Sequence, residues 1–259
     1  MKSNNWLSSR LEQTIVLSLL LLAGCYNPDK PVNSQANPDI FFKTLLVIGD
    51  DRSGSTSDIR KLTKEDYRML FETIGSKGGG AVAVCLIGNP SPQKREPYSL
   101  SLKTLNNIQY YDPKDPGLTL TEKGNLKAQN ENTRKLNEGK LNAQRNEINS
   151  FITKELESNV IKYIPSGPDD TDLDDAIDRI NTLIHEPLYT EFDKIIIALI
   201  SDGKNEPHSR ITPIKSKLSA PNAELFLVGW ETATECFTVR NTHKMSSKDG
   251  FIEMINNLK

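Results

Sequence analysis

The chain has 259 residues, so it can bury a substantial core, and its length fits one domain with appendages better than two full domains. Hydrophobic residues make up 36% and charged residues 25%, as in ordinary globular proteins, and the formal net charge of −2 excludes a global attraction to nucleic acid or anionic lipid. The three cysteines are too few for a disulfide framework, and pairing of Cys85 with Cys236 stays open because it depends on geometry.

The N-terminus has the pattern of a secretion signal. Lys2 and Arg10 precede an apolar stretch over residues 15–22, which is much shorter than the ~20 residues of a membrane span. The stretch ends in "LAGC", which resembles the signal box of bacterial lipoproteins, where the cysteine is lipidated and becomes the mature N-terminus. The resemblance implies a signal peptide over residues 1–24 and a lipid anchor on Cys25 in the bacterial cell envelope. An ordinary signal peptide that happens to contain this cysteine is the alternative.

The next segment is rich in Pro, Asn, Asp and Ser and offers almost nothing to bury. We therefore expect residues 25–41 to form the lipidated cysteine and an extended tether, which holds a domain over residues 42–259 off the membrane. Since the acyl chains provide the attachment, the domain itself can be soluble. Tyr26, in place of Asp, favours the outer membrane in a Gram-negative host, with the domain facing the periplasm or the cell surface.

From residue 40 onward, short apolar runs alternate with helical patterns. Runs rich in branched residues occupy positions 43–49, 81–88, 194–201 and 224–230. Continuous apolar runs are typical of strands buried on both faces, as in a parallel sheet covered by helices. Residues 97–105 alternate between apolar and polar instead, which predicts an antiparallel edge strand.

Helical patterns lie between these runs. Residues 63–75 are expected to form a helix with Thr63 as its N-cap and Asp66 three residues later. The expected buried face holds Tyr67, Leu70, Phe71 and Ile74. A second helix, over residues 172–184, has acids in its first turn and buries Leu173, Ala176, Ile177, Ile180 and Ile184. With a last helix over about residues 248–258, the alternation predicts an α/β fold with a doubly wound, mostly parallel central sheet flanked by helices.

One segment breaks this rhythm. Residues 122–158 are helix-prone and densely polar, and only the second half has an apolar stripe. The stripe consists of Leu141, Ile148, Ile152 and Leu156. We favour a solvated helical excursion whose C-terminal part packs on the sheet, and a partner-binding arm is the alternative.

Oxygen-bearing side chains occur where several of these elements begin or end. Asp51, Ser53 and Ser55 follow the first strand, Thr171 lies in the loop that opens a helix, and Asp202 follows a later strand. In an open α/β sheet, ligands bind just beyond the carboxyl ends of the strands. All five are hard oxygen donors without His or Cys, which excludes a zinc-type site and favours Mg²⁺, Mn²⁺ or Ca²⁺. Two aspartates and three hydroxyls leave such an ion an open position, which a carboxylate from another molecule can fill.

The segments "DRSGS", "TDL" and "SDG" resemble the three parts of the metal-ion-dependent adhesion site of von Willebrand factor type A domains. The resemblance covers residues 43–258. It implies that the five residues form the metal site, with Ser53 and Ser55 coordinating through their hydroxyls. It also implies a binding module, often for proteins, rather than a catalyst, and a protein partner that offers an acidic side chain.

The sequence departs from the family pattern at three places. Asp169 and Asp170 stand where small residues are common, and the segment over residues 122–158 exceeds the usual helices. Residues 231–244 are too short for the usual helix and a full last strand, which puts a sixth strand in doubt.

Two other functions and one structural reading stay open. A metal-dependent hydrolase of phosphatase or nuclease type would use the same acids and needs a base. The candidates are His185, His208 and His243, of which His208 is expected nearest the rim. A metal-free scaffold would make its contacts through the long polar helix. A helix-capping loop would explain the first acid–hydroxyl segment, but not its agreement with the other two.

Overall fold

The computed structural model describes residues 41–53, 61–88, 96–164, 171–189, 191–207 and 210–258. The expected signal peptide, Cys25 and most of the tether lie outside this part of the chain, as do Ser55, His208, Asp169 and Asp170. Among the described helices, none combines the length and apolar character needed to cross a bilayer.

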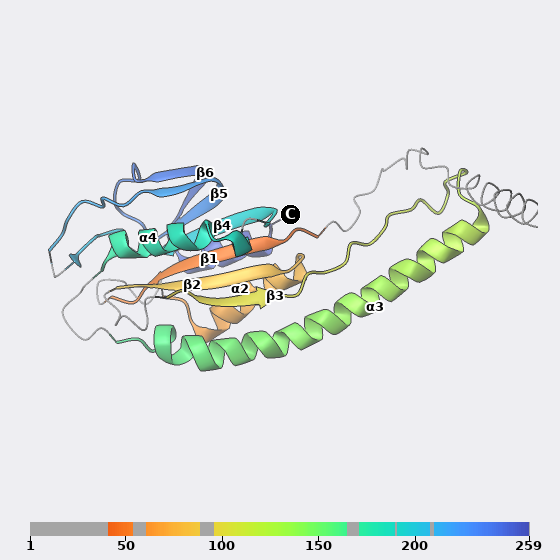
Figure 1. The fold of residues 1–259 in the computed structure, drawn as a ribbon, viewed down its shortest axis with the longest axis horizontal. Helices are drawn as coiled ribbons and strands as arrows, with labels where there is room; N and C mark the ends of the chain where they lie inside the picture. The colour runs from red at the N-terminus through yellow and green to blue at the C-terminus, as the bar shows by residue number, and fades with distance from the viewer. Residues whose placement is uncertain are drawn as a thin grey trace, which may run out of the picture.

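A six-stranded sheet in the order β3-β2-β1-β4-β5-β6 forms the centre of the fold (Figure 1). The strands are β1 (Thr44–Asp51), β2 (Gly80–Ile87), β3 (Tyr98–Leu102), β4 (Lys194–Ile200), β5 (Leu218–Val228) and β6 (Phe237–Met245). All neighbouring strands are parallel except β2 and β3. The predicted mostly parallel sheet with an antiparallel edge strand is therefore confirmed.

The doubt over a sixth strand was misplaced. β6 is present and pairs in parallel with β5, and the connection between them, residues 229–236, contains no helix. It is shorter than the dozen or more residues typical of a parallel crossover. It suffices because an extended chain covers ~3.3–3.6 Å per residue, enough to return along one strand. β5 also begins earlier than predicted and has a bulge between Ala220 and Glu224.

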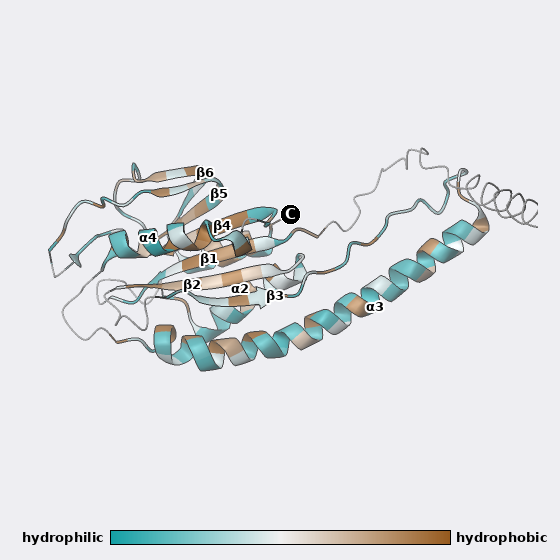
Figure 2. Ribbon diagram, viewed as in Figure 1, coloured by the Kyte–Doolittle hydropathy of each residue, from teal (hydrophilic) through white to brown (hydrophobic). Residues whose placement is uncertain are grey.

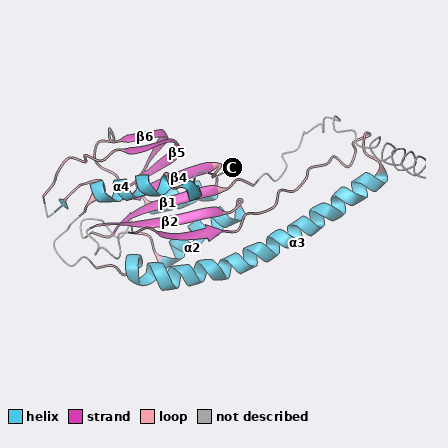
Figure 3. Ribbon diagram, in the orientation of Figure 1, coloured by secondary structure: helices cyan, strands magenta, loops and turns pink. Residues whose placement is uncertain are grey.

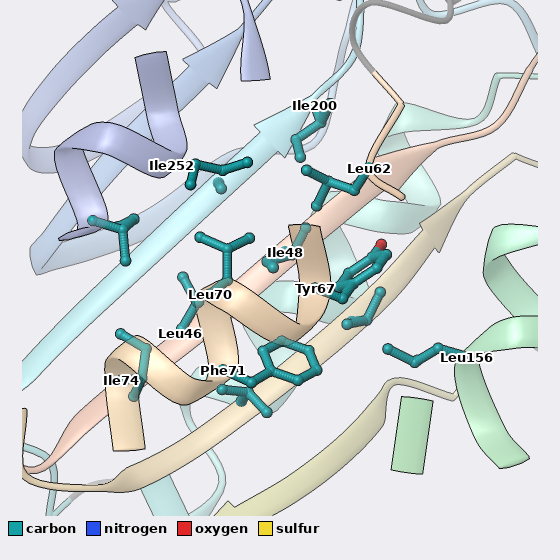
Figure 4. Close-up of a cluster of buried hydrophobic side chains, with 14 of the residues drawn as sticks. Leu46, Ile48, Leu62, Tyr67, Leu70, Phe71, Ile74, Leu156, Ile200 and Ile252 are labelled. Carbon is teal, nitrogen blue, oxygen red and sulfur yellow. The ribbon is translucent and has the colours of Figure 1, made fainter. Parts of the chain in front are cut away.

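Helices cover both faces of the sheet (Figure 3). On one face, α2 (Lys64–Ser76) and α5 (Lys248–Asn256) pack on even-numbered residues of β1, such as Ile48 (Figure 4). On the other face, α4 (Leu173–Ile184) packs on odd-numbered residues, such as Val47. Because side chains alternate along a strand, consecutive residues at the end of β1 point to opposite faces.

The N-terminus of α2 has the predicted capping box. The Thr63 hydroxyl accepts the Asp66 N–H at 3.2 Å, and the Asp66 carboxylate accepts the Thr63 N–H at 2.7 Å. Lys248 Nζ, at the start of α5, donates to the same carboxylate at 2.6 Å. Burial alone would raise the pKa of Asp66, but the hydrogen bonds from Lys248 and Thr63 outweigh it and lower this pKa. Asp66 thus joins the two helices on this face.

Replacing Lys248 with Met is expected to lower the free energy of unfolding by about 1 kcal/mol at pH 7, because it removes this partly buried hydrogen bond. The pKa of Asp66 in the folded state is lower than the ordinary value of an aspartate. The stability that the Lys248–Asp66 hydrogen bond contributes is therefore fully present above the pKa of Asp66 in the unfolded chain. It is lost as the pH falls through the pKa of Asp66 in the folded state. Urea unfolding at pH 7 and at pH 2 measures this difference. Lys64→Met, which breaks an exposed pair with Glu157, is the control with a smaller expected change. An equal effect of Lys248→Met at both pH values contradicts the prediction.

The long polar segment forms α3 (Leu120–Phe151), which continues as the π-helical η2 (Ile152–Ile161). The buried apolar residues of this unit all lie toward its C-terminus: Ile148, Phe151, Ile152, Leu156 and Val160. The N-terminal half of α3 extends beyond the sheet and is mostly hydrophilic (Figures 1 and 2). The predicted packing of the C-terminal part is confirmed, although Leu141 of the expected stripe is only half-buried.

Residues 130–144 of α3 lie against an extended segment over residues 103–109, which we call the strap. Three amide side chains, spaced seven residues apart, face the strap and are buried: Asn130, Asn137 and Gln144. We call their hydrogen bonds to the strap the amide ladder. Asn137 accepts the Asn106 N–H and donates to the Asn106 carbonyl, both at 2.9 Å. Gln144 accepts the N–H of Lys103, and Asn130 accepts the N–H of Gln109. These two strap residues lie three positions before and after Asn106. Seven helical residues rise ~10.5 Å and three extended residues span ~10 Å, so the two spacings match.

Replacing Asn137 with Ala is expected to speed hydrogen exchange of the Asn106 amide about tenfold or more. The substitution leaves a backbone N–H and a carbonyl without their partner, at a cost of about 1–3 kcal/mol. Exchange measured residue by residue on the folded protein reports this local opening. Asn142→Ala, at an exposed position of the same helix, controls for helix propensity. If both variants exchange equally fast at Asn106, the amide ladder does not hold the strap.

Candidate metal centre

The end of β1 meets the end of β4 at one edge of the sheet, which we call the rim. Asp50 is in register with Ile200, so the next residues of both strands are neighbours. Ser201 Oγ donates to Asp51 Oδ2 at 2.7 Å, and the Ser53 N–H donates to Asp51 Oδ1 at 2.9 Å. Asp51 and Ser53 are at most 2% exposed. The first predicted segment therefore places two of its oxygen-bearing side chains at the buried base of the rim.

Asp202 follows β4 at the same edge. Its backbone carbonyl accepts the Glu231 N–H at 2.9 Å, and its Oδ1 accepts the Lys204 N–H at 2.9 Å. Gly203 has a φ of +80°, and a Cβ there would come within 2.7 Å of the Trp230 ring. The sharp turn after Asp202 thus requires glycine, which explains the "DG" pair physically.

Thr171 lies beside the loop that follows β4. Its carbonyl accepts the Glu206 N–H at 2.8 Å in an isolated antiparallel bridge. Asn205, which precedes Glu206, accepts the Leu173 N–H on its side-chain Oδ1 at 3.0 Å and so fixes the start of α4. Thr171 is 1% exposed, and its Oγ1 has no hydrogen-bond partner among the described residues. A buried hydroxyl without a partner costs about 1–3 kcal/mol, so this atom fits a ligand position.

The structure therefore places four of the five predicted residues at one end of the sheet: Asp51, Ser53, Thr171 and Asp202. The fifth, Ser55, is outside the described residues. No group of three or more His, Cys, Asp or Glu side chains able to hold a metal lies in the described part of the chain. The rim instead combines two carboxylates with neutral hydroxyls. This donor set fits a hard divalent cation held by few charges.

Sequence reasoning missed two neighbours of this site. Ser201 precedes Asp202 and hydrogen-bonds Asp51, so it links the two strand ends. Lys204 Nζ lies 3.2 Å from Asp202 Oδ2, and this hydrogen bond raises the pKa of Lys204. The ammonium therefore occupies space beside a predicted metal ligand. The hydroxyl residue Ser201, directly before Asp202 in "SDG", could have been predicted from the sequence as a neighbour of the site. The sequence does not indicate that the Lys204 side chain points toward Asp202.

A buried polar cluster lies behind the rim, on the α2 face of the sheet. Asp50 is fully buried, and its Oδ2 accepts hydrogen bonds from Arg52 Nε at 3.0 Å and from the Tyr67 hydroxyl. Arg52 also donates to the Leu62 carbonyl at 2.6 Å. Figure 4 shows Tyr67 of α2 among apolar side chains of this face, such as Ile48 and Phe71. The cluster ties the end of β1 to α2.

Charge and burial favour one protonation state in this cluster. Burial raises the pKa of Tyr67 well above its ordinary value, so the phenol stays neutral and donates. Burial opposes the charge of Arg52, but the Asp50 carboxylate outweighs it and holds the pKa of Arg52 above its ordinary value. Arg52 is thereby fixed on the α2 face. Its two neighbours, Asp51 and Ser53, are left to face the rim.

A cavity of about 430 Å³ lies between the segment after β4, where Gly203 lines it, and the β5–β6 connection. Lys204, Thr232 and Cys236 are among its lining residues. Cys85 and Cys236 are both free, so the pairing left open by the sequence is not formed. Burial raises the pKa of Cys85 to about 12, which makes this thiol unreactive.

The two described histidines lie away from the rim. His185 caps the C-terminus of α4, the end opposite Thr171, and its Nδ1 is 2.7 Å from the Asn181 carbonyl. His243 lies within β6, where its ring stacks on Phe226 with centroids 4.7 Å apart. Neither is placed to act as a base at the predicted metal site.

No protein-family model matches the sequence, and no curated protein matches it. The interpretation of the rim therefore depends on its residues and their arrangement.

Proposed function

We propose that this protein is a lipid-anchored binding module of von Willebrand factor type A kind. Its rim holds Mg²⁺, or Mn²⁺ or Ca²⁺, and the ion binds an acidic side chain of a protein partner. The observation that carries the proposal is the buried Thr171 hydroxyl without a partner among the described residues, at the same edge as Asp51, Ser53 and Asp202. The doubly wound sheet with one antiparallel edge strand supports the same family.

The chemistry of the rim supports a binding role. Its donors are carboxylates and hydroxyls, which suit a hard cation and leave it net positive charge. A partner carboxylate at the open position would complete the coordination. The cavity of about 430 Å³ lined by Gly203 and Lys204 offers space for a neighbouring side chain of the partner. A hydrolase at the same rim lacks a histidine base among the described residues.

The proposed location of the protein depends on the lipid anchor at Cys25. Lipidation of Cys25 would hold the domain at the bacterial envelope, at the outer membrane in a Gram-negative host. The partner is then a protein of the periplasm or the cell surface.

Capture of partners from a solubilised envelope extract tests this function, with the soluble protein from residue 26 as bait. Retention of a defined protein in Mg²⁺, its loss in EDTA and its return on adding Mn²⁺ are the expected results. Ser53→Ala bait should behave like the EDTA sample. A partner retained equally with chelator and by Ser53→Ala would overturn the metal-dependent mode.

Replacing Lys204 with Met is expected to strengthen Mg²⁺ binding about fivefold at low salt. The ammonium competes with the ion for Asp202, and removing one exposed charge at this range changes the energy by about 1 kcal/mol. Calorimetric titration at two ionic strengths measures the effect, which should shrink as salt rises. Lys127→Met, at an exposed position of α3 that lies beyond the opposite end of the sheet, carries the same charge change and serves as control. Unchanged affinity in Lys204→Met would show that this lysine does not compete.

A further inference from the structure

The arm, which we define as the strap together with residues 110–147, leaves the sheet at the end where β1 begins. Leu102, the last residue of β3, is in register with Gly80, and Gly80 pairs with Thr44, the first residue of β1. The rim lies at the opposite end of β1. Figure 1 shows α3 continuing beyond the sheet on the side where β1 starts. The arm and the N-terminal attachment of the domain therefore share one side, and the rim faces the other.

The base of the arm is stiffened where the strap runs along residues 130–147 of α3. The amide ladder holds α3 to the strap at three points, and Lys140 Nζ donates to the Thr104 carbonyl at 2.7 Å. Lys103 and Glu147 form an ion pair at 2.8 Å where the arm joins the sheet. A helix tied to an extended chain in this way bends less freely than either element alone. The base of the arm therefore holds its direction, and beyond it α3 continues as a single helix to Leu120.

The length of the arm exceeds the average reach of the tether. From Gln144 to Leu120, α3 rises ~36 Å. A flexible chain as long as residues 26–42 has a root-mean-square span of about 20–25 Å, although it reaches ~55 Å when extended. A domain held at the average distance, with the start of β1 toward the bilayer, brings the arm into contact with the lipid surface.

The tip of the arm has the chemistry of a headgroup contact. Leu120 is 89% exposed, the largest exposed fraction of any large hydrophobic residue in the described part of the chain. Lys114 and Lys127, both exposed, flank it in sequence. Apolar side chains among lysines are typical of membrane interfaces, where ammonium groups reach the headgroups. Residues 110–127 also hold Lys123 and three acids, so their charges balance and anionic lipid is not required: Asp112, Asp115 and Glu122.

We propose that the arm is a strut whose tip, residues 110–123, rests on the membrane that carries the lipid anchor. The strut keeps the domain at a set height and turns the rim away from the bilayer, toward the partner. The proposal depends on lipidation of Cys25, which is part of the proposed function, but not on the metal.

Depth measurements on the full-length lipidated protein in phosphatidylcholine vesicles test the contact. An environment-sensitive fluorophore is attached at Leu120→Cys or, as control at the rim end, at Ile211→Cys, which is 74% exposed. Cys236→Ser removes the accessible native thiol, and Cys85 is buried. Brominated lipids are expected to quench the label at position 120 at least threefold more than at position 211. Equal quenching overturns the strut.

A shortened arm tests the height. Deleting residues 107–109 and 131–137 removes three strap residues and seven helical residues, which shortens the arm by ~10 Å. Asn130 then takes the place of Asn137 opposite Asn106, so the ladder keeps its register. Energy transfer from a label at Ile211→Cys to a lipid dye is expected to rise, reporting a rim closer to the membrane. An unchanged height contradicts the strut.

Three further outcomes separate the parts of the proposal. Failure of the wild-type protein to float with vesicles overturns the anchor and the strut together, while metal titration still tests the rim. Flotation without quenching at position 120 overturns the strut alone. Shielding of position 120 only after addition of envelope proteins assigns the tip to a protein partner and also overturns it.

Discussion

Replacing Asp50 with Ala is expected to lower the free energy of unfolding by about 3–5 kcal/mol, because it leaves a buried guanidinium without its counter-ion. Arg52 and Asp50 side chains are 5% and 0% exposed, and the same carboxylate also accepts the Tyr67 hydroxyl. Urea unfolding followed by circular dichroism measures the loss. The size of the effect reflects the penalty for an unpaired buried charge more than the attraction within the pair.

Two further variants keep this prediction testable if Asp50→Ala does not fold. Tyr67→Phe removes one donor and is expected to cost about 1–2 kcal/mol. Asp50→Ala combined with Arg52→Met removes both charges, and most of the stability should return because an apolar pair can replace a buried ion pair. A double variant as unstable as the single one would show that the charge imbalance is not the cause.

Replacing Thr171 with Val is expected to weaken Mg²⁺ binding at least tenfold while leaving the apoprotein as stable as the wild type, or more so. Valine has nearly the shape of threonine and removes the hydroxyl that has no partner among the described residues. Removing a buried polar group of this kind is neutral or stabilising when nothing satisfies it. Calorimetric titration and urea unfolding without metal measure the two effects. Weaker Mg²⁺ binding without a loss of apoprotein stability distinguishes a metal-ligand hydroxyl from one that only stabilises the fold.

Asp202→Ala is expected to weaken the same binding by 100-fold or more. Substitutions around metal ligands typically cost about 10–100-fold, and a direct carboxylate ligand contributes at least as much. Glu138→Ala, at an exposed position of α3, carries the same charge change away from the rim and should bind normally. Wild-type binding in Thr171→Val, or lower apoprotein stability in this variant, would contradict the metal assignment of the rim.

The main elements of the fold could be predicted because their signals are local. The apolar runs that became β1, β2 and β4 are buried almost along their whole length, as continuous hydrophobicity indicates. The capping box of α2 involves residues three apart in the chain, so its sequence pattern was sufficient. β6 could not be judged in this way, because its existence depends on an extended crossover in place of a helix.

The rim was partly accessible to sequence reasoning for a topological reason. Parallel strands end at a common edge, so residues placed after strands and before helices gather there whatever their separation in the chain. Asp51 and Ser201 are 150 positions apart and hydrogen-bonded. The approach of Lys204 to Asp202 depends on rotamers, which the sequence does not encode in a readable way.

The sequence by itself determined the alternation of strands and helices, the faces that they bury and the edge where the oxygen-bearing side chains meet, because periodicity and chain order reflect burial and topology directly. Only the tertiary structure decided the partners of its buried polar groups. Asp50 finds Tyr67 across 17 positions, and Asn137 finds the Asn106 backbone across 31. A polar residue in a sequence looks alike whether it faces water or a distant partner, and only the packed chain brings the partner within hydrogen-bond distance.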